Sequence, residues 1–250
     1  MKKLTSMILA IAVVFFFTCG SAMATYINPD GGGSEISLQT VLNNITVGGD
    51  SDVDAADADN DAISDDFDSY WKQTGSGGSS ATMIIELAGY KNDTTMGIYD
   101  GVNTVQLFSG AQGAGDQAHL SIKSDGRVFV NLAYTGVDFD SNHFGFYITT
   151  PNDTFYSDTA LNEDNFDHMV AFQGNDTQDV KLHPDLNAGL WTDNEFILAF
   201  EDKLGGGDKD YQDLVLMVES VEPVPEPTTL ILFGSGLLGL CAYARKRRKN

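Results

Sequence analysis

Short apolar runs recur along the chain from residue 81 onward, and polar or glycine-containing segments separate them. Segments 119–123 and 127–132 alternate between apolar and polar positions around a Ser-Asp-Gly sequence, which predicts a β-hairpin. No long helical period competes with this pattern. It therefore predicts an all-β fold, an antiparallel β-sandwich or jelly-roll-like domain. The other runs that predict strands are 83–87, 97–99, 105–108, 144–148, 168–172, 195–200 and 214–218.

The chain before residue 81 differs in composition and in its pattern of apolar positions. Segment 36–47 carries Leu38 and Leu42 and predicts a short helix or a strand. An acidic run over 50–68 follows it, and glycine-rich patches lie on both sides of this region. The sequence thus predicts an acidic, Gly-rich N-terminal region and a β-sandwich domain between two terminal segments. The expected divisions are 1–24, 25–80, 81–221 and 224–249.

The first 24 residues have the three parts of a secretory signal peptide. A lysine-containing start precedes an apolar stretch over 7–17, and small residues follow at 21–24. The apolar stretch is shorter than the roughly 20 residues that a membrane-spanning helix needs. We therefore expect signal peptidase to cleave between Ala24 and Thr25 and the rest of the chain to be exported.

The C-terminal segment begins with Pro225, Glu226 and Pro227. Residues 228–244 are almost entirely apolar, and residues 245–249 are all basic. An apolar run of this kind enters a membrane only as a helix, because a helix satisfies its own backbone hydrogen bonds. The basic cluster is expected to stay on the cytoplasmic side, which leaves the middle of the chain outside the cytoplasm.

This C-terminal arrangement resembles the PEP-CTERM sorting signal, which consists of a Pro-Glu-Pro triplet, an apolar helix and an Arg-rich tail. The resemblance covers about the last 27 residues. It implies a Gram-negative bacterium that makes exopolysaccharide, and processing near the triplet by a membrane enzyme of the exosortase type. The membrane anchor would then be transient, before delivery to the outer surface or the extracellular matrix. The alternative is a simple membrane anchor that keeps its helix.

The charge of the chain is strongly negative, with a net value of −22. Two lysines near the start and five basic residues at 245–249 account for seven of the 14 basic residues, so the middle is more acidic still. Such a surface repels nucleic acid and anionic lipid, and it attracts divalent cations or basic partners. Both cysteines lie in the terminal segments, so the middle has no disulfide and no thiol chemistry.

An acidic, glycine-containing loop lies between the predicted strands 195–200 and 214–218. Calcium takes six to eight oxygen ligands from carboxylates and carbonyls, and acids at positions 1, 3 and 6 of a turn can converge on one ion. Without a cation, acids this close would repel one another. The loop therefore predicts a calcium site, with a solvated acidic hairpin as the alternative. Its candidate ligands are Asp208, Asp210 and Asp213, with Glu201 and Asp202 from the other side of the hairpin.

The same segment resembles a family known only as domain-of-unknown-function family 4114. The resemblance is carried by Leu-Ala-Phe-Glu-Asp at 198–202 and by Gly-Gly-Asp-x-Asp-Tyr-x-Asp at 206–213. Segments 155–158 and 167–169 add to it, and we place it over roughly 81–221. Because no activity is established for that family, the resemblance implies none for this chain.

The acidic run offers a second, weaker calcium candidate. Five aspartates fall at positions 1, 3, 5, 9 and 12 of an EF-hand-like loop. Position 6 is Ala62 instead of glycine, position 12 is an aspartate with a shorter reach than glutamate, and no entering helix is evident. The alternative is a solvated linker. The five residues are Asp57, Asp59, Asp61, Asp65 and Asp68.

No pattern of catalytic residues stands out. The four histidines lack zinc-ligand spacing, and there is no G-x-S-x-G sequence. Tyr70, Trp71 and Trp191 are candidates for stacking on sugar rings, although aromatic residues in β proteins more often lie in the core. The sequence therefore predicts a non-enzymatic, calcium-binding structural or adhesive protein associated with exopolysaccharide or biofilm. The alternative is a secreted carbohydrate-active enzyme or carbohydrate-binding module on a jelly-roll scaffold.

Overall fold

The structure is a computed structural model that describes residues 28, 36–56, 62–63, 65–75, 79–86 and 93–225. The expected signal peptide and the expected C-terminal helix lie outside the described residues. Within the described part of the chain, no helix is long and apolar enough to cross a membrane.

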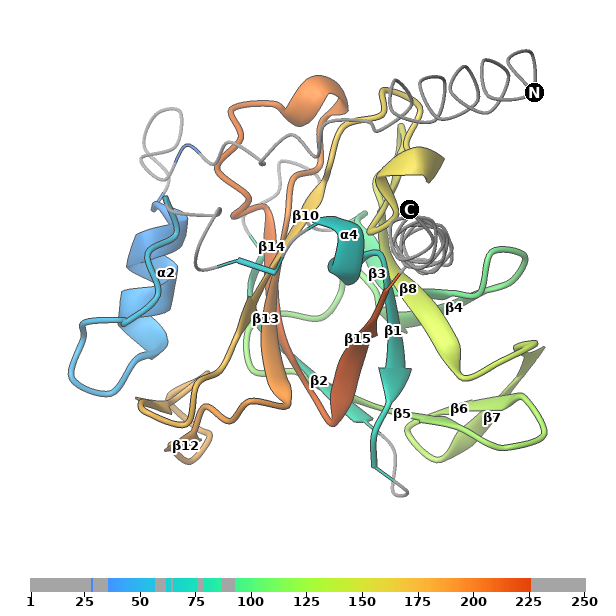
Figure 1. Ribbon diagram of the computed structural model, residues 1–250, viewed down its shortest axis with the longest axis horizontal. Helices are drawn as coiled ribbons and strands as arrows, with labels where there is room; N and C mark the ends of the chain where they lie inside the picture. Colours follow the sequence, from blue (N-terminus) through green and yellow to red (C-terminus); the bar gives the residue numbers. More distant parts are fainter. Residues whose placement is uncertain are drawn as a thin grey trace, which may run out of the picture.

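One antiparallel sheet has six strands within the described residues (Figure 1). Five of them run in the order β15, β1, β8, β3, β4, and β9 also pairs with β8. The sheet joins distant parts of the sequence, because β1 lies near residue 70 and its partner β15 ends just before Pro225. The strands are β1 (Tyr70–Gln73), β3 (Thr95–Tyr99), β4 (Thr104–Phe108), β8 (His143–Thr149), β9 (Thr154–Tyr156) and β15 (Val221–Val224).

A second antiparallel sheet has seven strands within the described residues, in the order β10, β13, β14, β2, β5, β6, β7. A separate pair, β11 (Asp179–Val180) and β12 (Gly189–Leu190), lies outside both sheets. The strands of the second sheet are β2 (Ser79–Glu86), β5 (Gln117–Ile122), β6 (Arg127–Val130), β7 (Ala133–Asp138), β10 (Met169–Gln173), β13 (Glu195–Phe200) and β14 (Leu214–Glu219).

Strands β13 and β14 are buried on both faces, which explains their uninterrupted apolar sequences. Phe196 and Leu198 of β13 point into a core that they share with Trp71 of the other sheet. Ile197 and Ala199 point the opposite way, into a second apolar cluster. Alternate side chains of a strand lie on opposite faces, so a strand with two covered faces needs apolar residues at every position.

Helix α2 (Leu38–Ile45) covers the second apolar cluster, on the side of the larger sheet away from β1 and β8 (Figure 1). Ser37 caps its first turn, because the side chain accepts a hydrogen bond from the backbone N–H of Thr40. The segment expected to form a helix or a strand is therefore a helix. Its buried residues recur every three or four positions, at Leu38, Val41, Leu42 and Ile45.

The prediction of a mostly β, antiparallel fold is confirmed, and so is the predicted hairpin. In that hairpin β5 pairs with β6, and Gly126 adopts a positive φ of 89° in the turn. The finer assignment to a sandwich or jelly roll stays a prediction. Strand β1, which lies in the region assigned to the N-terminal segment, was not expected from its mixed Tyr-Trp-Lys-Gln sequence.

Two of the three aromatic residues considered for sugar stacking lie in the core. The exposed fraction of Trp71 is 0% and that of Trp191 is 2%. The Trp71 ring packs edge-on against Phe146 and Phe196, and its indole N–H donates to the backbone oxygen of Asp68 at 2.7 Å. Neither tryptophan therefore offers a face to a sugar, and Trp71 instead joins the two sheets.

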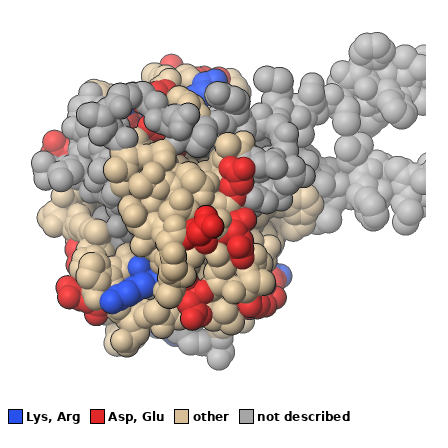
Figure 2. Space-filling model, turned by 90° about the vertical axis from the view of Figure 1, so that its left-hand side faces the viewer, with Lys and Arg blue, Asp and Glu red and all other residues tan. Residues whose placement is uncertain are grey.

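Acidic side chains are distributed over the described surface. Figure 2 shows the side of the molecule that carries α2, where Asp and Glu occur in several places and Lys and Arg in few. This distribution follows from the net charge of −22. A surface of this kind repels polyanions such as nucleic acid and favours cations.

Replacing Trp71 with Ala is expected to lower the free energy of unfolding by about 3–5 kcal/mol, because it leaves a large cavity between the sheets. Chemical denaturation followed by circular dichroism measures the change. Leu132→Ala is the matched control, because Leu132 is 84% exposed and its loss should change stability by no more than about 0.5 kcal/mol. Equal effects of the two substitutions would contradict the role given to Trp71.

Candidate metal centre

The acidic loop between β13 and β14 runs from Glu201 to Asp213. In the β13–β14 ladder Phe200 pairs with Leu214, so Glu201 and Asp213 are the first residues beyond the paired ends and lie opposite each other. Register of the ladder therefore brings together two carboxylates that are distant in the sequence. The short 3-10 helix η2 (Leu204–Gly206) lies within the loop.

Glycine is required where the loop folds back toward the segment before β10. Gly206 has a φ of 76°, and a Cβ atom built there would lie 2.2 Å from the ring of Phe166. Any other residue would therefore clash as well as be strained. The glycine-rich sequence allows the loop to close tightly enough to bury its acidic residues.

Three carboxylates of the loop converge. Glu201, Asp210 and Asp213 each place one carboxylate oxygen within 4.8 Å of the other two. Their exposed fractions are 0%, 1% and 4%, so the group is shielded from water. Within the described residues this is the one group of three or more acidic, histidine or cysteine side chains with metal-ligand spacing. We call these three residues the carboxylate triad.

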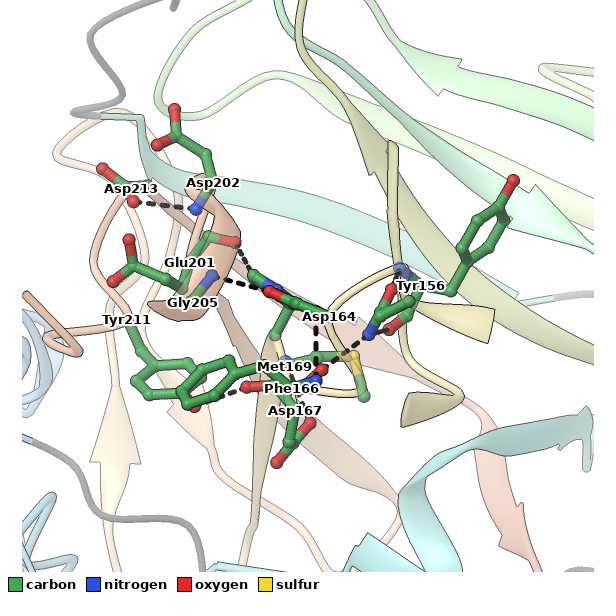
Figure 3. Close-up of polar contacts among 12 residues, drawn as sticks. Tyr156, Asp164, Phe166, Asp167, Met169, Glu201, Asp202, Gly205, Tyr211 and Asp213 are labelled. Carbon is green, nitrogen blue, oxygen red and sulfur yellow. Dashed lines mark hydrogen bonds and ion pairs between the residues drawn. The ribbon is translucent and has the colours of Figure 1, made fainter. Parts of the chain in front are cut away.

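Hydrogen bonds satisfy only part of the carboxylate triad, of which Figure 3 shows Glu201 and Asp213. Asp213 Oδ2 accepts from the backbone N–H of Asp202 at 3.0 Å, and Asp210 Oδ2 accepts from Gln212 Nε2 at 2.6 Å. Both carboxylate oxygens of Glu201 are buried and accept no hydrogen bond from the described residues. A buried carboxylate without a partner costs free energy unless it is protonated or binds a cation.

Burial and mutual repulsion raise the pKa values of the carboxylate triad. The pKa of Glu201 is raised to about 9, mainly by burial, then by the charge of Asp213, and then by the charges of the neighbouring aspartates. Burial and then the charge of Asp202 raise the pKa of Asp213 to about 6. The pKa of Asp210 is also raised, mainly by burial. The charged form of the group therefore needs a compensating cation.

The segment before β10 holds the acidic loop in place. The ring of His168 contacts the loop through Nδ1, which lies 2.9 Å from the backbone oxygen of Glu201, while its Nε2 lies 3.0 Å from Oδ2 of Asp164 in its own segment. Asp164 Oδ2 also accepts from the backbone N–H of Gly205 at 2.6 Å. The hydroxyl of Tyr211 donates to the backbone oxygen of Asp167 at 2.6 Å. These contacts fix both ends of the loop.

The structure brings together three of the five acids proposed as ligands from the sequence. Asp202 is buried and gives its backbone N–H to Asp213, but its carboxylate lies outside the carboxylate triad. Asp208 is half-buried and also lies outside it, although its charge raises the pKa of Glu201. Sequence reasoning missed the supporting role of Asp164. The position of His168 within segment 167–169, which contributed to the family resemblance, was the one sign in the sequence that this supporting segment matters.

The second candidate set is only partly described. Asp57, Asp59 and Asp61 lie outside the described residues. Asp65 and Asp68 lie in the short helix α4 (Asp65–Asp68), and the side chain of Asp68 is buried. A calcium site in this acidic run therefore stays a prediction. The signal cleavage residues and two of the three sorting residues also lie outside the description, at Ala24, Thr25, Glu226 and Pro227.

Without metal, the stability of the protein is expected to fall as the pH rises. The ordinary pKa values of Glu201 and Asp213 are 4.5 and 3.8, and the folded values are about 9 and 6. The native state thus binds more protons than the unfolded state between about pH 4 and pH 9, and its stability decreases across that range. Thermal unfolding in chelator across this range measures the effect.

Glu201→Gln is the control for this pH dependence, because it removes the group with the largest shift while keeping its shape. The variant should lose much less stability than the wild type between pH 6 and pH 9. Parallel losses in the two proteins would show that the pH dependence arises elsewhere.

Two family models match the chain. Residues 114–221 match the family described as "Domain of unknown function (DUF4114)", and residues 223–248 match the "PEP-CTERM protein-sorting motif". No curated protein and no solved structure matches the chain. The first match includes the whole carboxylate triad and the supporting segment 164–168. Residues 114–221 are therefore a DUF4114-like domain, and residues 223–248 carry a PEP-CTERM sorting motif, as the two resemblances predicted.

Proposed function

We propose that this protein is a non-enzymatic, calcium-stabilised structural or adhesive component of the exopolysaccharide matrix or biofilm outside a Gram-negative cell. The sorting motif marks it as an exported protein with a transient membrane anchor and processing by exosortase, a membrane enzyme. Its acidic surface favours cations and repels nucleic acid.

The observation that carries this proposal is the burial of Glu201 among two other carboxylates. Catalytic acids that cleave a polysaccharide must reach the sugar, whereas the carboxylate triad is at most 4% exposed. The open grooves near α2, near β12 and near the β5–β6 turn are lined by other residues. Buried acids at the end of a strand pair are suited to hold a stabilising ion.

Calcium is expected to raise the melting temperature of the purified protein relative to chelator, because an ion that binds only the folded state stabilises it by mass action. The shift should grow with free calcium concentration. Asp185→Asn is a control, because that side chain is 92% exposed and should leave the shift unchanged. Identical melting temperatures in calcium and in chelator would remove calcium from the proposal.

Replacing Pro225 and Pro227 with Ala is expected to leave the unprocessed chain in the membrane fraction, because the sorting triplet is lost. Cell fractionation and the mass of the mature protein measure this. The wild-type protein should appear at the surface or in the matrix. A deletion strain should also form a less cohesive matrix, and normal cohesion in that strain would contradict the structural role.

A carbohydrate-binding role is a second candidate. It is favoured by a polar groove beside the β5–β6 turn and the end of β7. The groove has a volume of about 760 Å³ and is lined by the turns 123–126 and 138–142. Tyr134 is half exposed nearby and donates a hydrogen bond to Asp138, which lines the groove. An exposed aromatic ring beside carboxylate and amide groups matches the chemistry of sugar recognition.

Fluorescence titration with oligosaccharides from the host exopolysaccharide would test this second role. Binding that Tyr134→Ala abolishes and Asp213→Asn preserves would favour a carbohydrate-binding module. Release of reducing ends from the polysaccharide would favour an enzyme and contradict the non-enzymatic proposal. Absence of both would leave the structural role as the better account.

A further inference from the structure

We propose that Glu201, Asp210 and Asp213 bind one calcium ion directly, and that this ion acts as a latch that closes the acidic loop onto segment 164–168 and Asn28. The inference rests on the calcium-stabilised role proposed above and names the ligands and the part of the molecule that the ion controls.

The carboxylate triad carries charge that its hydrogen bonds satisfy only in part. Both oxygens of Glu201 are completely buried without a hydrogen bond from the described residues, and they belong to a group of three converging carboxylates. Among the described residues, no lysine or arginine forms an ion pair with any member of the group. A cation at the centre would supply the missing partner for Glu201 and balance the charge of the other two carboxylates.

The size and chemistry of the carboxylate triad suit calcium. Three oxygens that lie within 4.8 Å of one another can approach a common ion after small side-chain adjustments, and calcium accepts oxygen ligands over a range of 2.3–2.6 Å. Magnesium prefers bonds of about 2.0–2.1 Å and keeps several waters, which a closed, buried group does not favour. An all-oxygen ligand set also disfavours zinc and copper, which prefer nitrogen and sulfur. Calcium is therefore the preferred ion.

The acidic loop is attached to the rest of the molecule at several places. One end of the loop contacts His168 through the Glu201 carbonyl, and its middle contacts Asp164 through the Gly205 amide. The far side of the loop accepts a hydrogen bond at the Lys209 carbonyl from the backbone N–H of Asn28, at 2.7 Å. Asn28 lies three residues after the expected mature terminus at Thr25. The loop therefore joins the start of the mature chain to the body of the domain.

Repulsion among the three carboxylates provides the opening force of the latch. Ionised carboxylates at these distances in a water-excluded site repel one another. The loop that carries the carboxylate triad also makes the contacts to segment 164–168 and Asn28, so a change in the spacing of these acids reaches those contacts. An ion reverses the sign of this interaction and keeps the contacts closed. Calcium modules that act outside cells have dissociation constants of about 10⁻⁴–10⁻³ M. We expect this range, so that the latch closes once the protein has been exported.

Hydrogen exchange of the purified protein at constant pH, with calcium, with magnesium or with chelator, tests the latch. Calcium should slow exchange at the amides of Asp202, Gly205 and Asn28, whose acceptors lie in or against the loop. Magnesium should have a much smaller effect. Amides in the β5–β6 hairpin, which is remote from the loop, should exchange equally in all three conditions.

Calorimetric titration of the same protein tests the ligands. Glu201→Gln and Asp213→Asn should each weaken calcium binding by at least about tenfold, equal to about 1.4 kcal/mol. Asp208→Asn is the matched control, because it removes one charge from the same loop and keeps all three members of the carboxylate triad, and it should change binding much less. Glu201→Gln removes a buried charge, so the variant is expected to fold without calcium, and circular dichroism checks this.

The latch is overturned if Glu201→Gln binds calcium as tightly as the wild type, or if calcium leaves exchange at Gly205 unchanged. These outcomes are independent of the matrix role. If the protein reaches the matrix and supports its cohesion but shows no calcium effect at the loop, only the latch proposal is contradicted. If calcium closes the loop but the matrix of a deletion strain is as cohesive as that of the wild type, only the proposed matrix role is contradicted.

Discussion

Burial of the Glu201 carboxylate beside Asp210 and Asp213 is the constraint on which the rest of the account depends. Three acids in a site that excludes water are stable only when they are protonated or share a cation. The β13–β14 ladder fixes two of them opposite each other, and the glycine-rich turn delivers the third. The six-stranded sheet covers one face of this strand pair and α2 the other, so the position of the acids is set by the core of the domain.

The support behind the carboxylate triad connects local chemistry to the whole fold. His168 and Asp164 hold the loop from the segment that leads into β10, the neighbour of β13. The loop is therefore connected both to the segment that leads into β10, at one edge of the larger sheet, and to Asn28. An ion that neutralises three carboxylates can in this way stabilise a region much larger than its own ligand shell.

Much of the fold could be predicted because strands with one buried face alternate and strands with two buried faces are continuously apolar. Strand β1 escaped prediction because only Trp71 of its four residues is buried, so its sequence lacks either pattern. The acids of the loop could be predicted from their spacing beside glycines. Which of these acids converge could not be predicted, because backbone geometry in the loop decides whether Asp210 or Asp208 turns inward. The contribution of Asp164 could not be predicted either, because it depends on a contact between distant parts of the chain.

The most direct test of the central claim is a crystal structure of the exported protein grown with calcium. The account predicts one ion bound within about 2.3–2.6 Å of a carboxylate oxygen from each of Glu201, Asp210 and Asp213. An electron-density map without an ion at this position, with Glu201 instead protonated and hydrogen-bonded to a neighbouring aspartate, would contradict it.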